Sequence, residues 1–222
     1  MNDSFRLGED GIYRCVAFEQ EFVWQQHGFG TRSANPPADV TLRQIHSDLV
    51  WNAHGLKDRE QQGDALISNE PGRSVGVRTA DCVPILLLDA RRRAVAAVHA
   101  GWRGTFSQIV TRAVEKMAAD FGTLPGDVRA ALGPAIRECC YEVGWDVARR
   151  FEALFPEDTG PPGKRHLNLV EANRRHLLAA GVPIEGIFDC GLCTSCPSRH
   201  FFSFRREPQD PGRMLASIRR LA

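Results

Sequence analysis

The sequence lacks a long hydrophobic run and an excess of charge of either sign. Its longest strongly apolar run covers residues 83–88, far shorter than the roughly 20 residues of a membrane-spanning helix. Lys and Arg together number 28 against 27 Asp and Glu, so the formal net charge is +1. This balance argues against a protein that binds nucleic acid or a membrane surface, whereas a small anion needs only local positive charge. We therefore expect neither nucleic acid nor membrane among its partners.

The sequence also has neither the pattern of a secretory signal nor that of a disulfide framework. The first residues, MNDSFRLGEDG, have no basic start followed by an apolar stretch, so we expect a soluble, cytoplasmic protein. The seven cysteines are an odd number in a chain large enough to form a core without disulfides. In a reducing compartment they favour buried thiols, metal ligands or a nucleophile. Export by an unconventional route stays an alternative.

Short apolar runs alternate with helical periodicity through the middle of the chain. The runs that predict strands are 74–78, 84–88, 94–98, 128–132 and 184–190. Apolar residues spaced three or four apart predict a helix over 106–121 that stops at Gly122. Further helices are expected over 145–155 and from Asn168, whose side chain can cap the helix while Glu171 answers three residues later. Residues 214–221 form a closing amphipathic segment.

These elements predict a mixed α+β fold, with mixed β-sheets flanked by helices. We find no internal repeat and no long low-complexity segment. The loop over 156–165, rich in Pro and Gly, is the best candidate boundary, but the sequence after it is too short for an independent domain. We therefore expect one catalytic domain over residues 1–222.

Three segments concentrate chemically active side chains. They are RQIHS at 43–47, TADCVP at 79–84 and HAGWRG at 99–104. In the third, His99 ends a strand where two glycines permit a sharp turn before a helix, whose first N–H groups can face an anion. Taken alone, a cysteine at a strand start is more often a small buried hydrophobe, and a single histidine is more often structural. Spacing by itself is a weak indication of a shared site.

The combination of motifs resembles the YfiH-type family, long labelled laccase domain or polyphenol oxidase and more recently purine nucleoside phosphorylase. The matching stretches are RQIHSDLV, GDALISNEPG, TADCVPILLLDA, AVAAVHAGWRGT, ALGPAIRECCYEVG and FFSFRRE with GRMLASI. The resemblance implies a cysteine-hydrolase-type fold and one metal ion, zinc or sometimes copper, bound by His46, Cys82 and His99. Three such ligands leave the fourth position of zinc open, which is the catalytic arrangement.

A true laccase is disfavoured by what the sequence contains. A multicopper oxidase needs several copper centres and many histidines, often in His-X-His pairs. This chain has seven histidines and no such pair, and its three methionines lie outside the segments at 43–47, 79–84 and 99–104. A blue-copper centre would use a weak axial ligand such as Met.

The resemblance implies phosphorolysis of adenosine, inosine, guanosine and methylthioadenosine, together with adenosine deamination, by a protein that is usually monomeric. Purine nucleosides and phosphate are then the expected small-molecule partners. Arg32, Arg43 and Arg103 flank the motifs and are the candidates for binding phosphate. The alternative is that these are surface arginines paired with neighbouring acidic residues, which would flank the motifs in the same way.

Two aspartates are candidates for supporting roles at the same site. Asp64 and Asp81 could carry protons or hold a metal-binding histidine in place. We favour the second role for Asp81, because side chains of adjacent strand residues point to opposite faces.

Two other functions stay open. Cys82 and His99 could form a nucleophile and its base. That chemistry suits a hydrolase that removes a misincorporated amino acid from a UDP-muramyl cell-wall precursor, a role proposed in this family. A non-catalytic zinc-stabilised binding module is the third possibility, although structural zinc usually takes four ligands.

The remaining cysteines and arginines are given structural interpretations. Cys190, Cys193 and Cys196 have a metal-like spacing that His200 could complete, but we interpret them as buried thiols, and the Cys139–Cys140 pair as packing near the site. Arg205, Arg206 and Arg213 could form a cationic rim for phosphate, and we favour a solvated face for them.

Overall fold

The computed structural model describes residues 4–158, 162–197, 200–209 and 212–222, and it contains two large β-sheets. The order of the five-stranded sheet is β1 (Phe5–Leu7), β2 (Tyr13–Cys15), β3 (Gln25–Phe29), β13 (Met214–Arg220) and β6 (Ser74–Thr79). The order of the six-stranded sheet is β12 (Ile187–Asp189), β9 (Val128–Leu132), β7 (Val83–Asp89), β8 (Val95–Ala100), β5 (Ala65–Ser68) and β4 (Val50–Asn52). Both parallel and antiparallel pairs occur in the six-stranded sheet, so the expected mixed α+β fold is confirmed.

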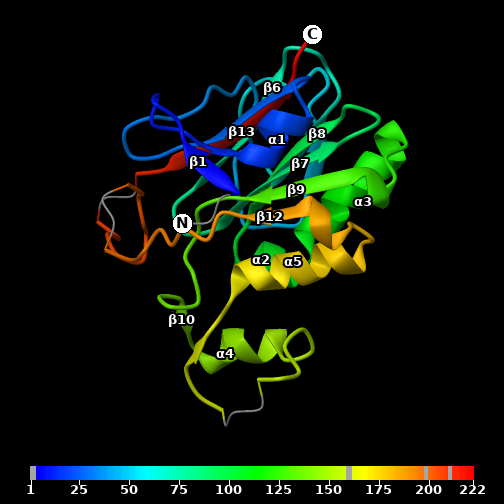
Figure 1. Ribbon diagram of the computed structural model, residues 1–222. Coiled ribbons are helices and arrows are strands. Elements are labelled where there is room, and N and C mark those ends of the chain that lie inside the picture. Colours follow the sequence, from blue (N-terminus) through cyan, green and yellow to red (C-terminus); the bar gives the residue numbers. More distant parts are fainter. Residues whose placement is uncertain (1–3, 159–161, 198–199, 210–211) are drawn as a thin grey trace.

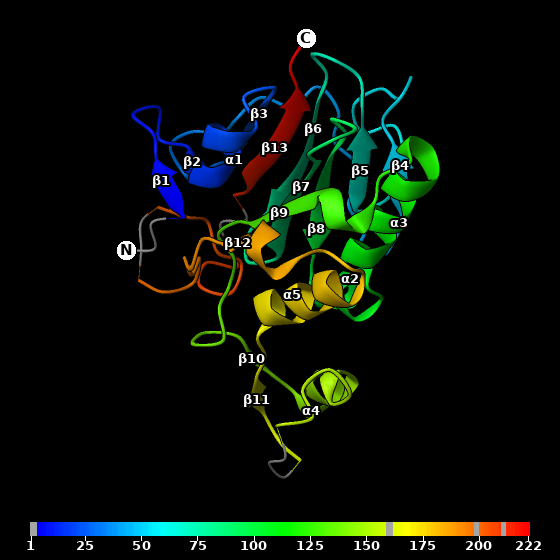
Figure 2. The ribbon, with the colours of Figure 1, turned by 45° about the vertical axis from the view of Figure 1, so that its right-hand side comes forward.

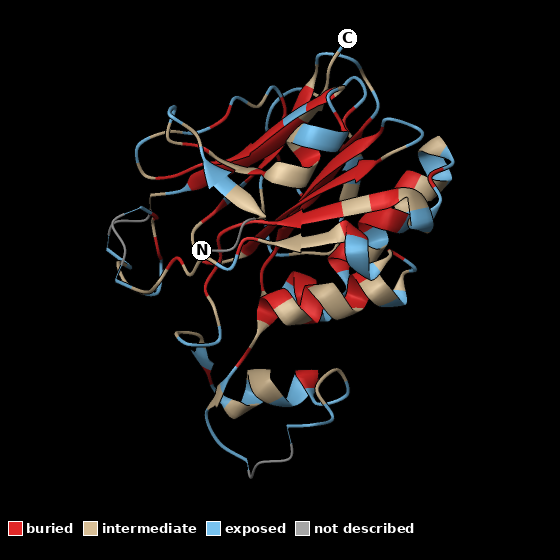
Figure 3. Cartoon of the chain, viewed as in Figure 1, coloured by how far each residue is buried: buried red, intermediate tan, exposed pale blue. Residues whose placement is uncertain are grey.

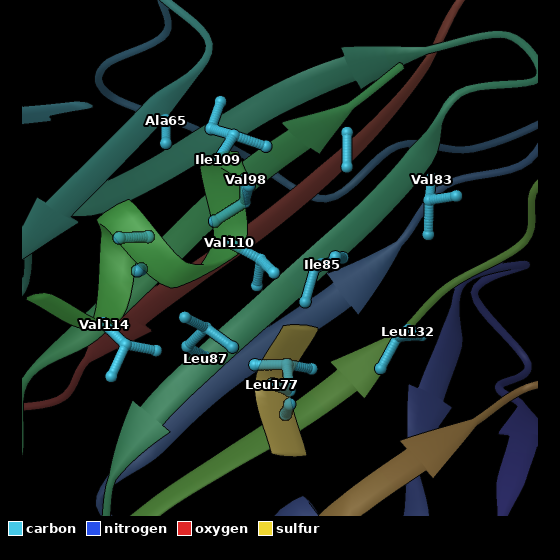
Figure 4. Packing of buried hydrophobic residues seen from close by; sticks show 14 of the residues in the cluster. Ala65, Val83, Ile85, Leu87, Val98, Ile109, Val110, Val114, Leu132 and Leu177 are labelled. Atoms are coloured by element: carbon cyan, nitrogen blue, oxygen red, sulfur yellow. The ribbon is translucent and has the colours of Figure 1, made fainter. Parts of the chain in front are cut away.

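The six-stranded sheet is buried on both faces. Along β7, Ile85 and Leu87 belong to a core shared with helices, while Leu86 and Leu88 belong to a core shared with the five-stranded sheet. Alternation of side chains along a strand explains this division. Figure 4 shows the helix-side core, in which Leu87 faces helical residues such as Val114. The strands through the centre of the molecule are accordingly almost wholly buried in Figure 3.

Helices cover the outer face of the six-stranded sheet, so the layers run sheet, sheet, helix (Figures 1 and 2). The helices there are α2 (Trp102–Phe106), α3 (Ile109–Phe121) and α5 (Leu169–Ala179). The single helix expected over 106–121 is wrong at its start. Gln108 has a φ of 59° and separates α2 from α3, so Phe106 belongs to the earlier helix and is exposed.

The last third of the chain returns to both sheets. Asn168 caps α5 by accepting a hydrogen bond from the Glu171 amide, as expected, but the Glu171 carboxylate binds Arg174 and Arg175 instead of the cap. The strand expected over 184–190 shortens to β12, because residues 184–186 form a 3₁₀ turn. The closing amphipathic segment is strand β13, which joins β3 to β6. Helix α1 (Val16–Glu21) packs near β2 and β3.

A segment between residues 139 and 168 projects from the layered body (Figure 2). It contains the short pair β10 (Glu142–Val143) and β11 (Arg165–His166), with α4 (Trp145–Ala148) between them. The helix expected over 145–155 is therefore shorter, since a 3₁₀ turn follows over 149–151. Of the loop expected over 156–165, residues 159–161 lie outside the described residues. No helix among the described residues has the length and hydropathy that a membrane span requires.

Candidate metal centre

The register of the six-stranded sheet brings separate motifs to one edge. Strands β7 and β8 are antiparallel, with Pro84 opposite His99, so Cys82 lies just beyond the paired end of β8. Strand β5 is antiparallel to β8, and the His99 amide donates to the carbonyl of Asp64, directly before β5. The start of β5, the end of β8 and the start of β7 therefore meet at the same place.

The three predicted metal ligands converge at this edge. The ligand atoms of His46, Cys82 and His99 all lie within 4.8 Å of one another. The imidazole centroids of His46 and His99 are 4.9 Å apart, with the rings inclined by 74°. His99 is buried, Cys82 is half-buried and His46 is exposed, so the trio opens toward solvent on the His46 side.

A single buried carboxylate, that of Asp64, organises both histidines. Its Oδ1 accepts hydrogen bonds from Nδ1 of His99 at 2.8 Å and from the backbone amide of His46 at 3.0 Å. Its Oδ2 accepts from the amide and hydroxyl of Ser47, at 2.6 and 2.7 Å. Burial alone would raise the pKa of Asp64, but the hydrogen bonds from His99 and Ser47 lower this pKa to about 2. Asp64 is therefore a fixed negative charge at neutral pH.

Asp81 has a different position from the one expected. Its Oδ1 accepts a hydrogen bond from the Thr194 hydroxyl at 2.6 Å, and its Oδ2 accepts from the Arg205 amide at 2.7 Å. The contact with a metal histidine that we expected of Asp81 is made by Asp64 instead. Asp81 precedes β7 and has a φ of 88°, so the alternation of an extended strand does not apply to it. A proton-carrying role for either aspartate stays a prediction.

Two of the site's backbone positions are strained. His46 has a φ of 60° and Asp81 a φ of 88°, a region that residues other than glycine rarely adopt. Each such conformation costs on the order of 1–3 kcal/mol, and it persists only where the surrounding contacts hold it. The Asp64 carboxylate holds His46, while Thr194 and Arg205 hold Asp81.

Gly101 is required by the close approach of two ligands. A Cβ at this position would lie 3.0 Å from Sγ of Cys82 and 3.0 Å from Cδ2 of His46. The glycine therefore lets the backbone after β8 pass directly beneath the trio.

Cys82 and His99 shift each other's pKa values. Burial would raise the pKa of the Cys82 thiol, but the charge of His99 and hydrogen bonds from both histidines lower it below its ordinary value. Burial would lower the pKa of His99, but Cys82 and Asp64 together raise it. Both shifts favour the charged forms, a thiolate on Cys82 and an imidazolium on His99. Because Asp64 occupies Nδ1 of His99, Nε2 is the ring nitrogen left for Cys82 or a metal ion.

The donor set fits a zinc-like ion. A thiolate and two imidazoles are the ligands that zinc takes at catalytic sites, with one position open. A carboxylate on the far nitrogen of a ligand histidine is the usual support for such a site. Among the described residues, the trio and the carboxylate that holds it are already assembled.

Sequence reasoning missed Tyr141. Its hydroxyl lies within electrostatic reach of Cys82, Asp81, Arg103 and Arg205. Burial, and then the negative charge of Cys82, raise the pKa of Tyr141 to about 12, so the phenol stays protonated. The only available signal was its place after the Cys-Cys pair in a family motif.

The candidate phosphate-binding arginines have different surroundings. The guanidinium of Arg32 pairs with Glu207 and lies over the Phe202 ring, and that of Arg43 donates to the Glu60 carbonyl. Arg103 is exposed, lies against the Trp102 ring 4.5 Å away, and has no ion pair within the described part of the chain. Of the three, Arg103 is therefore the one whose guanidinium is most available to an anion.

The three arginines interpreted as a solvated face differ as well. The Arg205 guanidinium lies 5.3 Å from the Tyr141 ring and donates to the Glu142 carbonyl, so it borders the site. Arg206 donates to the carbonyls of Thr194, Cys196 and Phe201, which fixes the loop around them. Arg205 is exposed, as the solvated-face interpretation expects, whereas that interpretation is wrong for the half-buried Arg206.

A cavity lies beneath α4, between the projecting segment and α5. Trp145, Phe155, Arg165 and Arg175 are among its lining residues, and none of the metal ligands is. It is a concave feature separate from the trio.

The substitution Gly101→Ala tests the close approach beneath the ligands. We expect zinc affinity to fall by about tenfold to a hundredfold, because the added methyl group displaces Cys82 or His46. Competition titration against a chromogenic chelator measures this. Gly126→Ala is the matched control, since a Cβ there meets nothing within 4 Å. Equal affinity in both variants would contradict the described geometry.

The substitution Asp64→Asn tests the carboxylate. We expect weaker zinc binding and a loss of about 3 kcal/mol of unfolding free energy at pH 7, because an amide nitrogen would face the Ser47 donors. The pKa of Asp64 is about 2 in the folded protein, below its ordinary value, so its stabilisation is complete above about pH 4 and disappears toward pH 2.

Urea unfolding of wild type and Asp64→Asn between pH 7 and 2.5 measures this difference. The gap between the two should narrow below about pH 4. Asp48→Asn, which removes a partly exposed ion pair with Arg112, should change stability by less than about 1 kcal/mol. A gap that is independent of pH would exclude Asp64 as the source.

Comparisons with known proteins identify the family of the chain. A family model described as "Multi-copper polyphenol oxidoreductase laccase" matches residues 22–220. A purine nucleoside phosphorylase of Bacteroides thetaiotaomicron is 42% identical over 164 residues, which are 70% of this chain and 60% of that protein. Adenosine deaminase RL5, from an unknown prokaryotic organism, is 41% identical over 82% of this chain and 74% of that protein.

A solved structure has the same fold. The crystal structure of YlmD from Geobacillus stearothermophilus is 30% identical, with a TM-score of 0.86 over 99% of this chain and 100% of that chain. The family match spans nearly the whole sequence, and the motif resemblance is thereby confirmed. The chain belongs to the family described as multi-copper polyphenol oxidoreductase laccase, whose relatives include the YfiH and YlmD proteins.

Proposed function

We propose that the chain is a metal-dependent enzyme of purine nucleosides that performs phosphorolysis and adenosine deamination. The observation that carries the proposal is the His46, Cys82 and His99 trio held by Asp64 at an open edge. The names of the Bacteroides relative and of adenosine deaminase RL5 supply the substrate class. Adenosine, inosine, guanosine and methylthioadenosine are the proposed substrates.

The proposed metal is zinc. A divalent ion held by His46, Cys82 and His99 would supply a Lewis acid and would lower the pKa of a bound water to about 7. The described residues offer one trio with two histidines and one group of four cysteines. Neither resembles the histidine-rich copper cluster that the laccase name suggests, so oxidation of polyphenols is the less favoured activity.

Phosphorolysis and deamination break different bonds of the nucleoside. In phosphorolysis a phosphate oxygen forms a bond to C1′ of the ribose, the bond from C1′ to the purine nitrogen breaks, and the base leaves with a proton. In deamination water adds at C6 of adenosine and ammonia leaves. The protonated hydroxyl of Tyr141, which lies within electrostatic reach of Cys82, is proposed to donate a hydrogen bond to the purine in both reactions.

Phosphate needs a fixed cation near the trio. Arg103 lies two positions after Gly101 and is exposed, and its charge acts on Tyr141. Arg205 comes from a segment much later in the sequence, and its guanidinium lies 5.3 Å from the Tyr141 ring. We assign phosphate binding to Arg103, with Arg205 as a second contact. Arg32 and Arg43 are weaker candidates, because their guanidinium groups already have partners.

A cysteine hydrolase is the second candidate. Cys82, His99 and Asp64 form the sequence of nucleophile, base and orienting acid found in cysteine hydrolases, with the His99–Asp64 hydrogen bond at 2.8 Å. In that case Cys82 would be alkylated readily and chelators would leave activity unchanged. A thiolate that binds a metal would be protected until the metal is removed.

Turnover of adenosine and inosine, with and without phosphate, tests the proposed function. We expect phosphate-dependent release of the base and phosphate-independent release of ammonia from adenosine. In Cys82→Ala both activities and about one equivalent of bound metal should be lost together, because one ligand is gone. Cys15→Ala, which removes a buried thiol far from the trio in sequence, is the control. Inactivity of the metal-loaded wild type toward both nucleosides would contradict the proposal and favour the hydrolase.

The substitution Arg103→Gln separates the two reactions. We expect the KM for phosphate in phosphorolysis to rise about tenfold or more, while deamination, which uses no phosphate, keeps its rate. Arg43→Gln is the matched control, because its guanidinium donates to Glu60 instead. Comparable effects of both substitutions, or equal loss of both reactions in Arg103→Gln, would show that Arg103 does not bind phosphate.

A further inference from the structure

Four cysteines form a second cluster of potential metal ligands. Cys139 and Cys140 come from the turn before β10, and Cys193 and Cys196 from the loop after β12. Their four Sγ atoms all lie within 4.8 Å of one another. Cys139 and Cys196 are 57 positions apart in the sequence, so the fold itself brings the two pairs together.

The spacing of the sulfur atoms matches a tetrahedral ion. Sγ of Cys196 lies 3.5 Å from that of Cys139 and 3.6 Å from that of Cys140, and the latter two are 3.7 Å apart. A tetrahedron with zinc–sulfur bonds of about 2.3 Å has sulfur–sulfur edges of about 3.8 Å. Three of the edges are therefore within about 0.3 Å of the length that a zinc tetrathiolate requires.

The surroundings of the cluster suit a negatively charged centre. The Arg137 amide donates to Sγ of Cys193 at 3.4 Å, a contact that stabilises a thiolate. Arg206 donates to the carbonyl of Cys196, which places its charge beside the cluster. Both arginines come from segments that flank the cysteines.

We propose that Cys139, Cys140, Cys193 and Cys196 bind a zinc ion as a closed tetrathiolate site, distinct from the His46, Cys82 and His99 trio. A four-cysteine site leaves no open position, which is the arrangement of structural zinc. Its role is to fasten the base of the projecting segment to the loop after β12. A metal crosslink stabilises a fold most when it closes a long loop, because the entropic cost of loop closure grows with loop length.

The fastened segments both lead to the candidate metal centre. Tyr141 follows Cys140 directly, and Thr194 lies between Cys193 and Cys196 and donates to Asp81. The tetrathiolate would thus position Thr194, which holds the residue directly before Cys82, and Tyr141, which lies within electrostatic reach of Cys82. Of the three regularly spaced cysteines that we interpreted as buried thiols, only Cys190 is buried; it accepts from the Leu192 amide and lies outside the group of four. Cys193 and Cys196 are half-buried, so the interpretation is wrong for them.

Zinc content of the full-length protein tests this proposal. The protein is produced with added zinc and purified under reducing conditions without chelator, and its metal is measured by elemental mass spectrometry. We expect about two zinc ions per chain in wild type, about one in Cys82→Ala, about one in Cys196→Ser and almost none in the double variant. Cys190→Ala is the matched control, and it should keep about two.

Cobalt identifies which site holds the remaining ion. Metal-free Cys82→Ala loaded with Co²⁺ should show the intense near-ultraviolet thiolate-to-cobalt absorption expected of four sulfur ligands. In the double variant Cys82→Ala, Cys139→Ser this absorption should be weaker, because one sulfur ligand is gone. Cys139 is chosen because it is the exposed cysteine of the four, so its replacement disturbs packing least.

Several results would overturn the proposal. They are a wild type that contains only one zinc ion per chain, a Cys82→Ala variant that is purified without zinc, or disulfides between these cysteines in protein kept reduced. If the serine variants fail to fold, the zinc content of Cys82→Ala still decides. Because none of these readouts uses nucleoside turnover, failure here leaves the proposed activity untouched, and the reverse also holds.

Discussion

The hydrogen bonds of Asp64 are the interaction on which the candidate metal centre depends. One buried carboxylate receives donors from a strand end, through His99, and from a strained loop, through His46 and Ser47. Burying this charge is costly unless every acceptor position is used, and here the two oxygens accept five hydrogen bonds. The loop geometry and the ring orientation are therefore coupled, so neither histidine can move without disturbing the other.

The same contacts explain why two chemistries compete for this site. A thiolate beside an imidazole that a carboxylate holds can either bind an ion or attack a carbonyl carbon. The nearby His46 distinguishes the two, because a hydrolase needs no second imidazole within 4.9 Å of the first. Its exposed position leaves one side of the trio open, as substrate access to a bound ion requires.

Local patterns predicted the central sheet well and its partners poorly. Apolar runs identified β7, β8 and β9 because those strands are buried on both faces. Strand β3, with the sequence QQHGF, has no such pattern because two of its polar residues, Gln25 and His27, are buried and hydrogen-bonded to each other. The break at Gln108 depends on one left-handed residue that periodicity cannot detect. The motifs indicated the metal trio, whereas the role of Asp64 follows from the register of β5 against β8. The tetrathiolate was hidden for the same reason, since regular spacing directed attention to Cys190 instead of Cys139 and Cys140.

The ligands of the trio lie at positions 46, 82 and 99, on segments that meet only in the folded sheet. An unfolded chain offers these side chains singly, so it competes weakly for metal. With the proposed ion bound, mass action would tie the folded population to the free metal concentration, with a gain of about 1.4 kcal/mol for each tenfold excess over the dissociation constant. Metal supply and protein lifetime would then be linked, because scarcity of the ion would lower the proposed activity and also increase the fraction of unfolded chains open to proteolysis.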